Sequence, residues 1–453
     1  MTSVEDVLRH VVEKLRPLPE TLEKTEDVTA RLVQRLEDVF GKGRVSVEGS
    51  FAKGTMVRGR EESDIFIHFQ PGFPVDEACR RVVEEGVKAV VEMGGVYRLR
   101  YASHPYVEGF VDGVRVNIVP CYDAEYGKWI TPVDRTPYHT AYVKKNLPPA
   151  GADHVRLLKA FLMNDNLYGA EVKTRGFSGY VCELLITRFG SFTSLVQAAS
   201  RWRPPVVIGE DKPAPMTVLH LPDPVDPGRN TAAAVSLTTL SNFILKSKLF
   251  LTKPSIDYFL GDTALETVVE GRSFLGLVFT VPNQPPDVLW GELNHTVEGL
   301  TRGLNGLGFT VLRSDRWADE KTGVMVFELE SNTLPPVVLH MGPPVWSGNA
   351  ERFIAEQMRK KELLAPPWVA GDRLYSLLRR RFSDSAAALQ HLIQSGQASV
   401  SKHLQPHLRN AKTYRDIGSL MEALADEGKN FLKEFVRTCP RYIATYVSSL
   451  STS

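Results

Sequence analysis

The chain has 453 residues, of which 43% are apolar and 24% charged, an ordinary composition for a folded protein of two to four domains. Lys and Arg number 54 against 53 Asp and Glu, so the net charge of +1 does not by itself indicate a partner. The four cysteines are far apart without CxxC spacing, which argues against a disulfide scaffold or a zinc site. No window approaches the ~18 apolar residues of a membrane span, so we expect a soluble cytoplasmic protein.

The first 140 residues predict a mixed sheet covered by helices. Ser3 and Asp6 form an N-cap pattern before a helix that ends near Pro17, and further helices are expected at about 20–40 and 76–93. After the third helix, apolar and polar residues alternate along the sequence, as they do in strands. This alternation predicts strands at 96–102, 107–111 and 114–119, with Asp112-Gly113 as a hairpin turn.

The rest of the chain separates into two regions. Residues 141–248 are mainly helical in pattern, with a proline-rich interruption at 204–227 and a last helix expected at 231–248. A third region begins near Gly271 and is expected to combine a sheet with a helix. Its expected strands lie at 275–280, 310–312, 324–329 and 337–341, its helix at 289–307, and a polar helical end includes a final helix near 421–436.

The most informative stretch runs from residue 44 to 69 and is expected to form strand, turn, short helix and strand. Gly49-Ser50 directly follows an alternating apolar run, and its backbone N–H and hydroxyl suit contact with a phosphate. Glu62 and Asp64 begin the next strand, where side chains two apart share a face. Two adjacent carboxylates repel each other, so they favour a site for divalent cations, although a solvated strand start carries the same pattern.

A third ligand is expected on the strand at 114–119. If this strand lies beside the one that carries Glu62 and Asp64, the side chain of Asn117 faces the same site. The order Gly-Ser, spacer, acidic-x-acidic resembles the polymerase-beta-like nucleotidyltransferase superfamily, and this resemblance implies an Asp where Asn117 stands. An amide oxygen binds a cation without supplying charge. We therefore interpret Asn117 either as an Asp→Asn change introduced to trap complexes or as the mark of a natural homologue with impaired chemistry.

Further segments narrow the resemblance. They are HPYVEGFVDGVRVNIVPCY, TPVDRTPYHT, VRLLKAFLMNDNLYGAE, TRGFSGYVCELLI and DPVDPGRNTAAAVS. Together they are similar to the archaeal-type (class I) CCA-adding enzymes, which rebuild the 3′-terminal CCA of tRNA from CTP and ATP without a nucleic-acid template. The resemblance covers about residues 44–240 and thins beyond 260 to a short Met341-Gly342-Pro343 segment.

The resemblance implies roles for individual residues. The implied catalytic and metal-binding residues are Glu62, Asp64 and Asn117, with Mg²⁺ as the cofactor. The implied nucleotide-binding residues are Ser50, Lys53, Lys159 and Tyr168 for the triphosphate, Thr136 and His139 for the pocket, and Arg229 for the base edge. From the residues alone, each of these has an ordinary structural interpretation as well, such as an exposed lysine, a core aromatic or a loop arginine. Lys53 departs from the arginine that the family most often has.

The sequence thus predicts a multidomain α+β protein. We expect a catalytic nucleotidyltransferase head with a mixed sheet at 1–142, a helical neck with nucleotide-selecting residues at 143–262, and a tRNA-binding α/β body and helical tail at 263–453. The expected function is template-independent CCA addition by two-metal nucleotidyl transfer, impaired in this chain by Asn117. The expected partners are tRNA, CTP and ATP, with no membrane, and a homodimer is left open. Two alternatives remain, an impaired binding homologue and another polymerase such as a poly(A) polymerase or oligoadenylate synthetase. The expected contacts to the tRNA backbone are Arg379, Arg380, Arg381, His403, His407 and Arg409.

Overall fold

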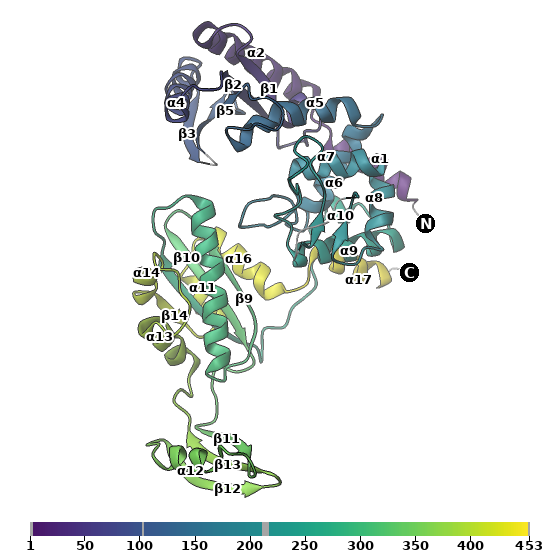
Figure 1. Cartoon of the computed structure of the whole chain (residues 1–453). Helices are drawn as coiled ribbons and strands as arrows, with labels where there is room; N and C mark the ends of the chain where they lie inside the picture. The colour runs from purple at the N-terminus through teal and green to yellow at the C-terminus, as the bar shows by residue number, and fades with distance from the viewer. Residues whose placement is uncertain (1–2, 102–103, 211–216, 452–453) are drawn as a thin grey trace. The chain divides into compact units, whose positions relative to one another are not determined.

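The computed structural model describes residues 3–101, 104–210 and 217–451, and the chain divides into two compact units (Figure 1). The first unit comprises residues 1–265 and 439–453, and the second comprises residues 266–438. Residues 439–451, which we expected with the C-terminal body, therefore pack in the first unit. The assignment of functions to head, neck and body stays a prediction.

The first unit contains a five-stranded mixed sheet in the order β1-β2-β5-β4-β3. β2 and β5 are parallel, and the other neighbouring pairs are antiparallel. Asp112 (φ 51°) and Gly113 (φ 80°) form the expected left-handed turn between β4 and β5. The strands are β1 (Val45–Glu48), β2 (Glu62–Phe69), β3 (Val96–Tyr101), β4 (Pro105–Val111) and β5 (Val114–Tyr122). Ala102, the expected end of the third predicted strand, lies outside the described residues.

Two helices, α2 (Pro19–Phe40) and α4 (Val75–Glu92), cover one face of this sheet. Their apolar stripes pack on the alternate residues of β2 and β5, such as Ile65 and Ile118, which are fully buried. The opposite face carries Glu62, Asp64 and Asn117, because side chains alternate along a strand. A short helix, α3 (Gly49–Ala52), connects β1 towards β2.

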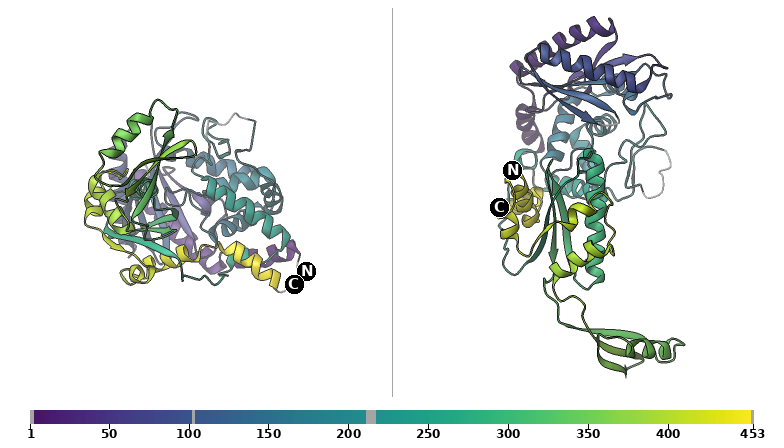
Figure 2. Two further views of the ribbon diagram at one scale, coloured as in Figure 1. Left: turned by 90° about the horizontal axis from the view of Figure 1, so that it is seen from below. Right: turned by 90° about the vertical axis from the view of Figure 1, so that its left-hand side faces the viewer.

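The remainder of the first unit is a helical assembly around an aromatic core in which Phe161 contacts Phe192, Phe243, Phe250 and Tyr258. α1 packs on α6, and α17 packs on α9 and α10, so the first and last helices lie at the same end of this unit (Figure 2). The elements are α1 (Val4–Leu15), the 3₁₀ turn η1 (Pro132–Arg135), α5 (Thr136–Asn146), α6 (Gly151–Met163), α7 (Gly179–Phe189), α8 (Phe192–Ala199), β6 (Val206–Val207), β7 (Leu219–His220), α9 (Leu237–Thr252), α10 (Asp257–Leu260) and α17 (Arg441–Ser451).

The second unit is built on two antiparallel sheets, of order β14-β8-β10-β9 and β11-β13-β12. Val324 and Val326 of the first sheet pack against α15 and α16, whereas α11 contacts β9 and α12 covers the small sheet. The elements are β8 (Ser273–Thr280), α11 (Pro286–Gly306), β9 (Val311–Ala318), β10 (Thr322–Leu329), β11 (Val337–Pro344), α12 (Ala350–Met358), β12 (Leu363–Ala370), β13 (Arg373–Arg379), α13 (Ser385–Ser395), α14 (Gln405–Arg409), β14 (Lys412–Tyr414), α15 (Ile417–Glu422) and α16 (Asp426–Arg437).

The α+β multidomain class is confirmed, whereas three local expectations were wrong. The helix expected at 231–248 begins at Leu237, because the Ser236 side chain caps it by accepting from Thr239 N (3.1 Å). The helix expected near 421–436 is two helices, and the turn between them buries Leu424 against the sheet. Strands β12 and β13 occupy part of the end expected to be helical; β12 is an edge strand, where its prolines are tolerated.

No helix in the described part of the chain is long and apolar enough to cross a membrane. The proline-rich stretch expected at 204–227 contains residues 211–216, which lie outside the described residues. Its described parts form the two-stranded parallel pair β6 and β7 and the loop that follows them.

Candidate active site

The open face of the five-stranded sheet brings together the three residues predicted to bind metal. β5 lies beside β2 with Asn117 opposite Asp64, and Asn117 Nδ2 donates to Asp64 Oδ1 (2.8 Å). Glu62 lies two residues before Asp64 on the same face and forms an ion pair with Arg115 of β5. The juxtaposition expected from alternation is therefore present in the fold, while the catalytic roles of these residues stay predictions.

The charge around Asp64 is unbalanced. Burial and then the neighbouring charge of Glu62 raise the pKa of Asp64 to about 6, against the hydrogen bond from Asn117 and the charges of Lys53 and Arg115. The positive charges near Asp64 do not offset its burial and the charge of Glu62. A cation that bound both carboxylates would supply the missing positive charge.

The residues at this position fit one divalent cation. Two carboxylates and an amide oxygen are the oxygen ligands that such ions prefer, and the raised pKa of Asp64 shows the charge that an ion would neutralise. Among residues 3–101, 104–210 and 217–451, no three His, Cys, Asp or Glu side chains converge as a metal site. The fold therefore offers two charged ligands, Glu62 and Asp64, and one neutral ligand, Asn117.

The Gly49-Ser50 turn lies directly against these carboxylates. Gly49 has φ +72°, and a Cβ on it would overlap the carboxylate of Asp64, so only glycine permits this close approach. Ser50 is on the short helix α3 that follows, and Lys53 caps its end. The predicted phosphate contacts and the predicted metal ligands thus adjoin each other.

Two of the predicted phosphate-binding residues, Lys53 and Lys159, lie beside Glu183, a buried carboxylate on α7. Glu183 is 1% exposed and accepts from Lys53 Nζ (2.6 Å) and from Thr55 Oγ1 (2.7 Å). Lys159 of α6 is buried beside them and donates to the backbone oxygen of Thr55 (3.0 Å). Burial lowers the pKa of Lys159, and the charge of Glu183 opposes that shift.

Tyr168 completes this phosphate-side group. A Cβ on Gly179, the first residue of α7, would lie 3.0 Å from the Tyr168 hydroxyl and 3.9 Å from Lys159 Nζ. Both side chains therefore converge on the start of α7, where the helix dipole is positive. Burial raises the pKa of the Tyr168 hydroxyl, which keeps it protonated and able to donate.

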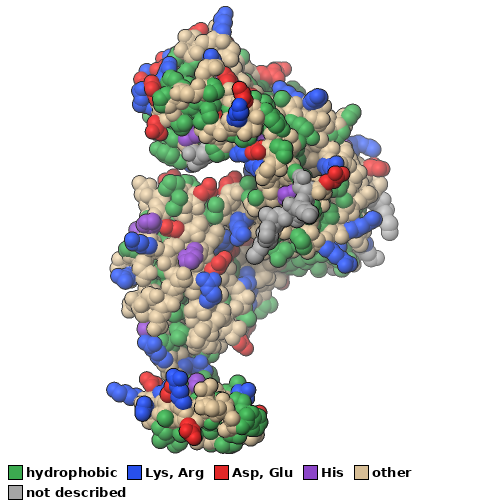
Figure 3. Space-filling view, in the orientation of Figure 1, with side chains coloured by type: hydrophobic (Ala, Val, Ile, Leu, Met, Phe, Trp, Pro, Cys, Tyr) green, Lys and Arg blue, Asp and Glu red, His purple; other side chains and the backbone are tan. Residues whose placement is uncertain are grey.

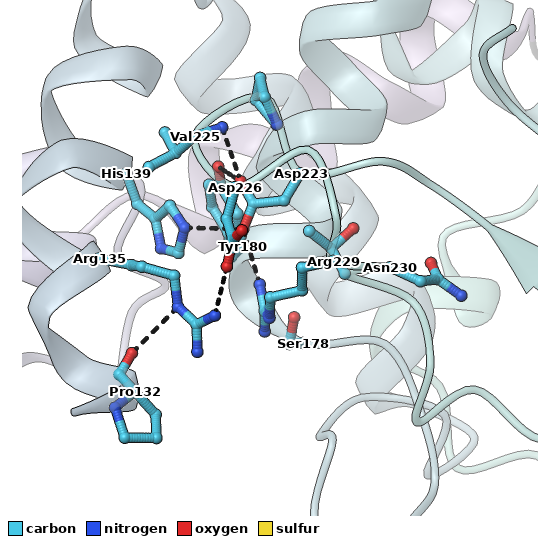
Figure 4. Close-up of polar contacts among 12 residues, drawn as sticks. Pro132, Arg135, His139, Ser178, Tyr180, Asp223, Val225, Asp226, Arg229 and Asn230 are labelled. Atoms are coloured by element: carbon cyan, nitrogen blue, oxygen red, sulfur yellow. Dashed lines mark hydrogen bonds and ion pairs between the residues drawn. The ribbon is translucent and has the colours of Figure 1, made fainter. Parts of the chain in front are cut away.

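His139 and Arg229 meet around a second buried carboxylate, Asp223 (Figure 4). His139 Nε2 lies 3.0 Å from Asp223 Oδ2, and Arg229 Nη1 donates to the same oxygen (2.9 Å). Tyr180 of α7 donates to Asp223 Oδ1 (3.0 Å), and its ring stacks on His139. Thr136, predicted for the same pocket, begins α5 and forms no hydrogen bond with these residues within the described chain.

The start of α7 lies between the two groups, because Gly179 contacts the phosphate side and Tyr180 the Asp223 side. Sequence reasoning did not identify Glu183, Asp223 or Tyr180. Glu183 could have been noticed as a carboxylate within the apolar run VCELLI, and Asp223 as an acidic residue between two prolines. Both signals are weak without the partners that the fold provides.

Some of the basic residues predicted to contact RNA in the second unit have local partners. His403 Nδ1 lies 2.6 Å from Glu292 Oε1, and Arg380 donates to the backbone oxygen of Pro335 (3.0 Å). On the face that Figure 3 shows, Lys and Arg side chains are scattered over this unit and do not form one block. The role of these residues stays a prediction.

The mixed sheet, the Gly-Ser turn and the paired carboxylates define the first unit as a nucleotidyltransferase. The family model described as a nucleotidyltransferase domain matches residues 30–139. The model of the second domain of tRNA nucleotidyltransferases matches residues 153–260, and that of the C-terminal domain of CCA-adding enzymes matches residues 270–415.

The curated relatives narrow this class. A CCA-adding enzyme of Pyrobaculum islandicum is 36% identical over 416 residues, which cover 89% of this chain and 97% of the relative. CCA-adding enzymes of Sulfurisphaera tokodaii and Methanothermobacter thermautotrophicus are 36% and 33% identical and cover 84% and 94% of this chain, and 90% and 96% of their own lengths. The chain belongs to the archaeal-type CCA-adding enzymes.

Among solved structures, a cytoplasmic RNA terminal U-transferase is 10% identical, covers 57% of this chain and 97% of its own, and has a TM-score of 0.44. This distant likeness adds nothing to the family assignment.

Proposed function

We propose that this chain adds the 3′-terminal CCA to tRNA from CTP and ATP without a nucleic-acid template. The observation that carries the proposal is the position of Glu62, Asp64 and Asn117 on one sheet face, against the Gly49-Ser50 turn, in a chain of this family. The reaction is attack of the tRNA 3′-hydroxyl on the α-phosphate of the nucleotide, with pyrophosphate as the leaving group.

The phosphate-side residues have the chemistry that a triphosphate requires. Lys53 and Lys159 supply positive charge, and Tyr168 and Ser50 supply hydroxyl donors. Because Glu183 already accepts from Lys53 and adds its charge near Lys159, the two ammonium groups are held in place before the ligand arrives. Holding donors in position before binding reduces the ordering that the ligand must induce.

Glu62 and Asp64 would hold Mg²⁺, with Asn117 as a neutral ligand. When bound, Mg²⁺ supplies positive charge that lowers the pKa of an attacking hydroxyl and neutralises charge that develops on the phosphate. A third negative ligand in the position of Asn117 would bind the ion more tightly. We therefore propose that this chain is slower than it would be with Asp at position 117.

On the base side, Arg229 is the residue proposed to read the nucleotide. Cytosine and adenine each present an unprotonated ring nitrogen on the pairing edge, whereas uracil and guanine present a ring N–H there. A guanidinium donates hydrogen bonds and accepts none. It can therefore bond to the ring nitrogen of cytosine or adenine, but not to the ring N–H of uracil or guanine. This chemistry matches the two nucleotides that CCA addition uses.

The neutral Asn117 also supports a second candidate, a homologue that binds tRNA and nucleotide with little or no transfer. One assay separates the candidates. The purified chain is incubated with tRNAs that end at the discriminator base, at C and at CC, and each of the four nucleoside triphosphates is supplied alone and in mixture.

Addition of C, C and then A, followed by a stop, is the expected result. Long A tails would instead assign the chain to the poly(A) polymerases. Binding of these tRNAs without addition, over enzyme concentrations up to the tRNA concentration, would contradict the proposed activity and support the binding homologue.

A further inference from the structure

Asp223 is the most completely satisfied side chain of the candidate site. Its carboxylate is inaccessible to solvent and accepts at both oxygens. Oδ1 accepts from the Tyr180 hydroxyl (3.0 Å) and from Val225 N (3.0 Å), while Oδ2 contacts His139 Nε2 (3.0 Å) and Arg229 Nη1 (2.9 Å). A carboxylate occupied in this way has no oxygen left for a ligand, so its effect on substrate must act through its neighbours.

The backbone around Asp223 fixes Arg229 in the same loop. Asp223 N donates to Arg229 O (3.0 Å), Arg229 N donates to Asp226 O (2.8 Å), and Asp226 N donates to Asp223 O (3.2 Å). These three bonds close residues 223–229 into a compact turn. The carboxylate of Asp223 and the guanidinium of Arg229 are therefore held by main chain as well as by their own hydrogen bond.

The turn is anchored at two points, by Arg135 at the end of η1 and by His139 in the first part of α5. Arg135 donates to Asp226 (2.7 Å), and four residues later His139 contacts Asp223 (Figure 4). Residues four apart lie on the same face of a helix, so the two pairs run side by side. Among the described residues, the side chains of Arg135 and Asp226 hold the loop without a hydrogen bond to the guanidinium of Arg229, so the Asp226 side chain serves as a control.

Arg229 is only partly committed by this arrangement. Its side chain is 37% exposed, and Nη1 donates to Asp223. Within the described chain, Nε and Nη2 have no protein acceptor, so one edge of the planar group remains available to a ligand. The bond to Asp223 thus decides which edge faces outward.

The same carboxylate determines the hydrogen position on His139. Burial by itself raises the pKa of Asp223, but the hydrogen bond and charge of His139, with the donors Val225 N and Arg229, hold it at about 2. An ionised carboxylate accepts only, so the ring nitrogen of His139 that faces it, Nε2, must carry a hydrogen. The ring is held flat against Tyr180, with 3.9 Å between the ring centroids.

We propose that Asp223 is a positioning residue that determines nucleotide selectivity by fixing the outward edge of Arg229. The proposal rests on the proposed function, because it assigns Arg229 to the nucleotide base. A rigid donor edge penalises a ring N–H, whereas a guanidinium free to rotate could find the oxygen acceptors of uracil and guanine.

The test compares Asp223→Asn with Asp226→Asn in the same loop. Steady-state kcat/KM is measured for CTP and UTP on tRNA that lacks CCA. Asp223→Asn is expected to lower the ratio of CTP to UTP by about 10- to 100-fold, the range for one charge-assisted hydrogen bond. Asp226→Asn, which loses only the bond to Arg135, is expected to keep the wild-type ratio even where it lowers thermal stability.

A double-mutant cycle excludes a role limited to stability. If Asp223 acts through Arg229, then Asp223→Asn in an Arg229→Ala background changes the ratio by less than about twofold. Independent effects of the two substitutions, or a folded Asp223→Asn protein with the wild-type ratio, would overturn the proposal. If Asp223→Asn does not fold, Tyr180→Phe serves in its place, because it removes one donor to Asp223 and retains the ring. A wild-type ratio of CTP to UTP in Tyr180→Phe would also overturn the proposal.

Equilibrium binding separates this proposal from the proposed function. Dissociation constants of CTP and UTP are measured by calorimetry for the wild-type and Asp223→Asn proteins together with tRNA. A wild-type protein that adds no nucleotide, yet binds CTP more tightly than UTP only when Asp223 is intact, would contradict the proposed activity and support the positioning role. Equal preference in both proteins would overturn the positioning role alone.

Discussion

Asp64 and Asp223 are carboxylates of the same unit, yet their surroundings shift their pKa values in opposite directions. Burial and then the neighbouring charge of Glu62 raise the pKa of Asp64 to about 6, although Asn117 donates a hydrogen bond to it. Asp223 has His139, Arg229 and a backbone N–H, and its pKa falls to about 2 although burial raises it. The fold itself supplies the positive partners of Asp223, whereas those near Asp64 leave an uncompensated charge that a bound cation can neutralise.

Removing the unbalanced carboxylate is expected to have the largest effect on activity. Asp64→Ala should lower nucleotide addition to CCA-lacking tRNA by at least about 10³-fold, because a metal ion in such a site contributes several kcal/mol to transition-state stabilisation. Primer extension under single-turnover conditions measures this. Activity close to that of the wild type would place the metal site elsewhere and would contradict the view that Asp64, unlike Asp223, binds a cation.

Restoring a third charge is expected to have the next largest effect. Asn117→Asp should raise the rate of C and A addition by on the order of 10²-fold, because an additional negative ligand strengthens cation binding beside Asp64. The same substitution should lower the Mg²⁺ concentration that gives half-maximal rate. If neither quantity changes, Asn117 is not a metal-side residue, and tRNA affinity measured in parallel controls for indirect effects.

The two aspartates should also respond oppositely to neutralisation in metal-free protein. Asp64→Asn should stabilise the fold by about 1–2 kcal/mol because it removes a buried charge and its repulsion with Glu62. Asp223→Asn should destabilise the fold by about 2 kcal/mol because charge-assisted hydrogen bonds are lost. Thermal unfolding in the presence of a chelator measures both. A shift in the same direction for both variants would contradict the contrast.

The smallest expected effect is on the pH dependence of stability. Folded Asp64 retains its proton up to about pH 6, whereas the unfolded chain releases it near 3.8. The unfolded state then binds fewer protons between these values, so stability falls as pH rises through this window. Asp223 has the opposite sign, and its contribution is lost only as pH falls from about 3.8 towards 2.

A bound cation should restore the folding stability that is lost when Asp64 ionises. The increase in the unfolding midpoint that Mg²⁺ causes is expected to be larger at about pH 7.5 than at about pH 5, since only the ionised carboxylate binds the ion. Asp64→Asn should remove this difference. An increase that is independent of pH in the wild type would show that Asp64 does not titrate in the site.

Much of the first sheet could be predicted because its signals are local. Alternation placed Glu62 and Asp64 on one face, and Asp112-Gly113 marked the turn that aligns β4 with β5. Where proline interrupts alternation, as in β12, the local pattern was misread as part of a polar helical end. The break between α15 and α16 was missed because burial of Leu424 depends on the sheet beneath it.

The sequence by itself determined the paired carboxylates, the Gly-Ser turn and the neutral Asn117, since each is a property of neighbours along one strand or turn. Only the tertiary structure decided which charges are balanced. Glu183 meets Lys53 across 130 positions of the chain, and Asp223 meets His139 across 84. A pKa depends on distance and burial in space. The same residue type therefore lacks a balancing charge at Asp64, whereas at Asp223 it is paired with the guanidinium of Arg229.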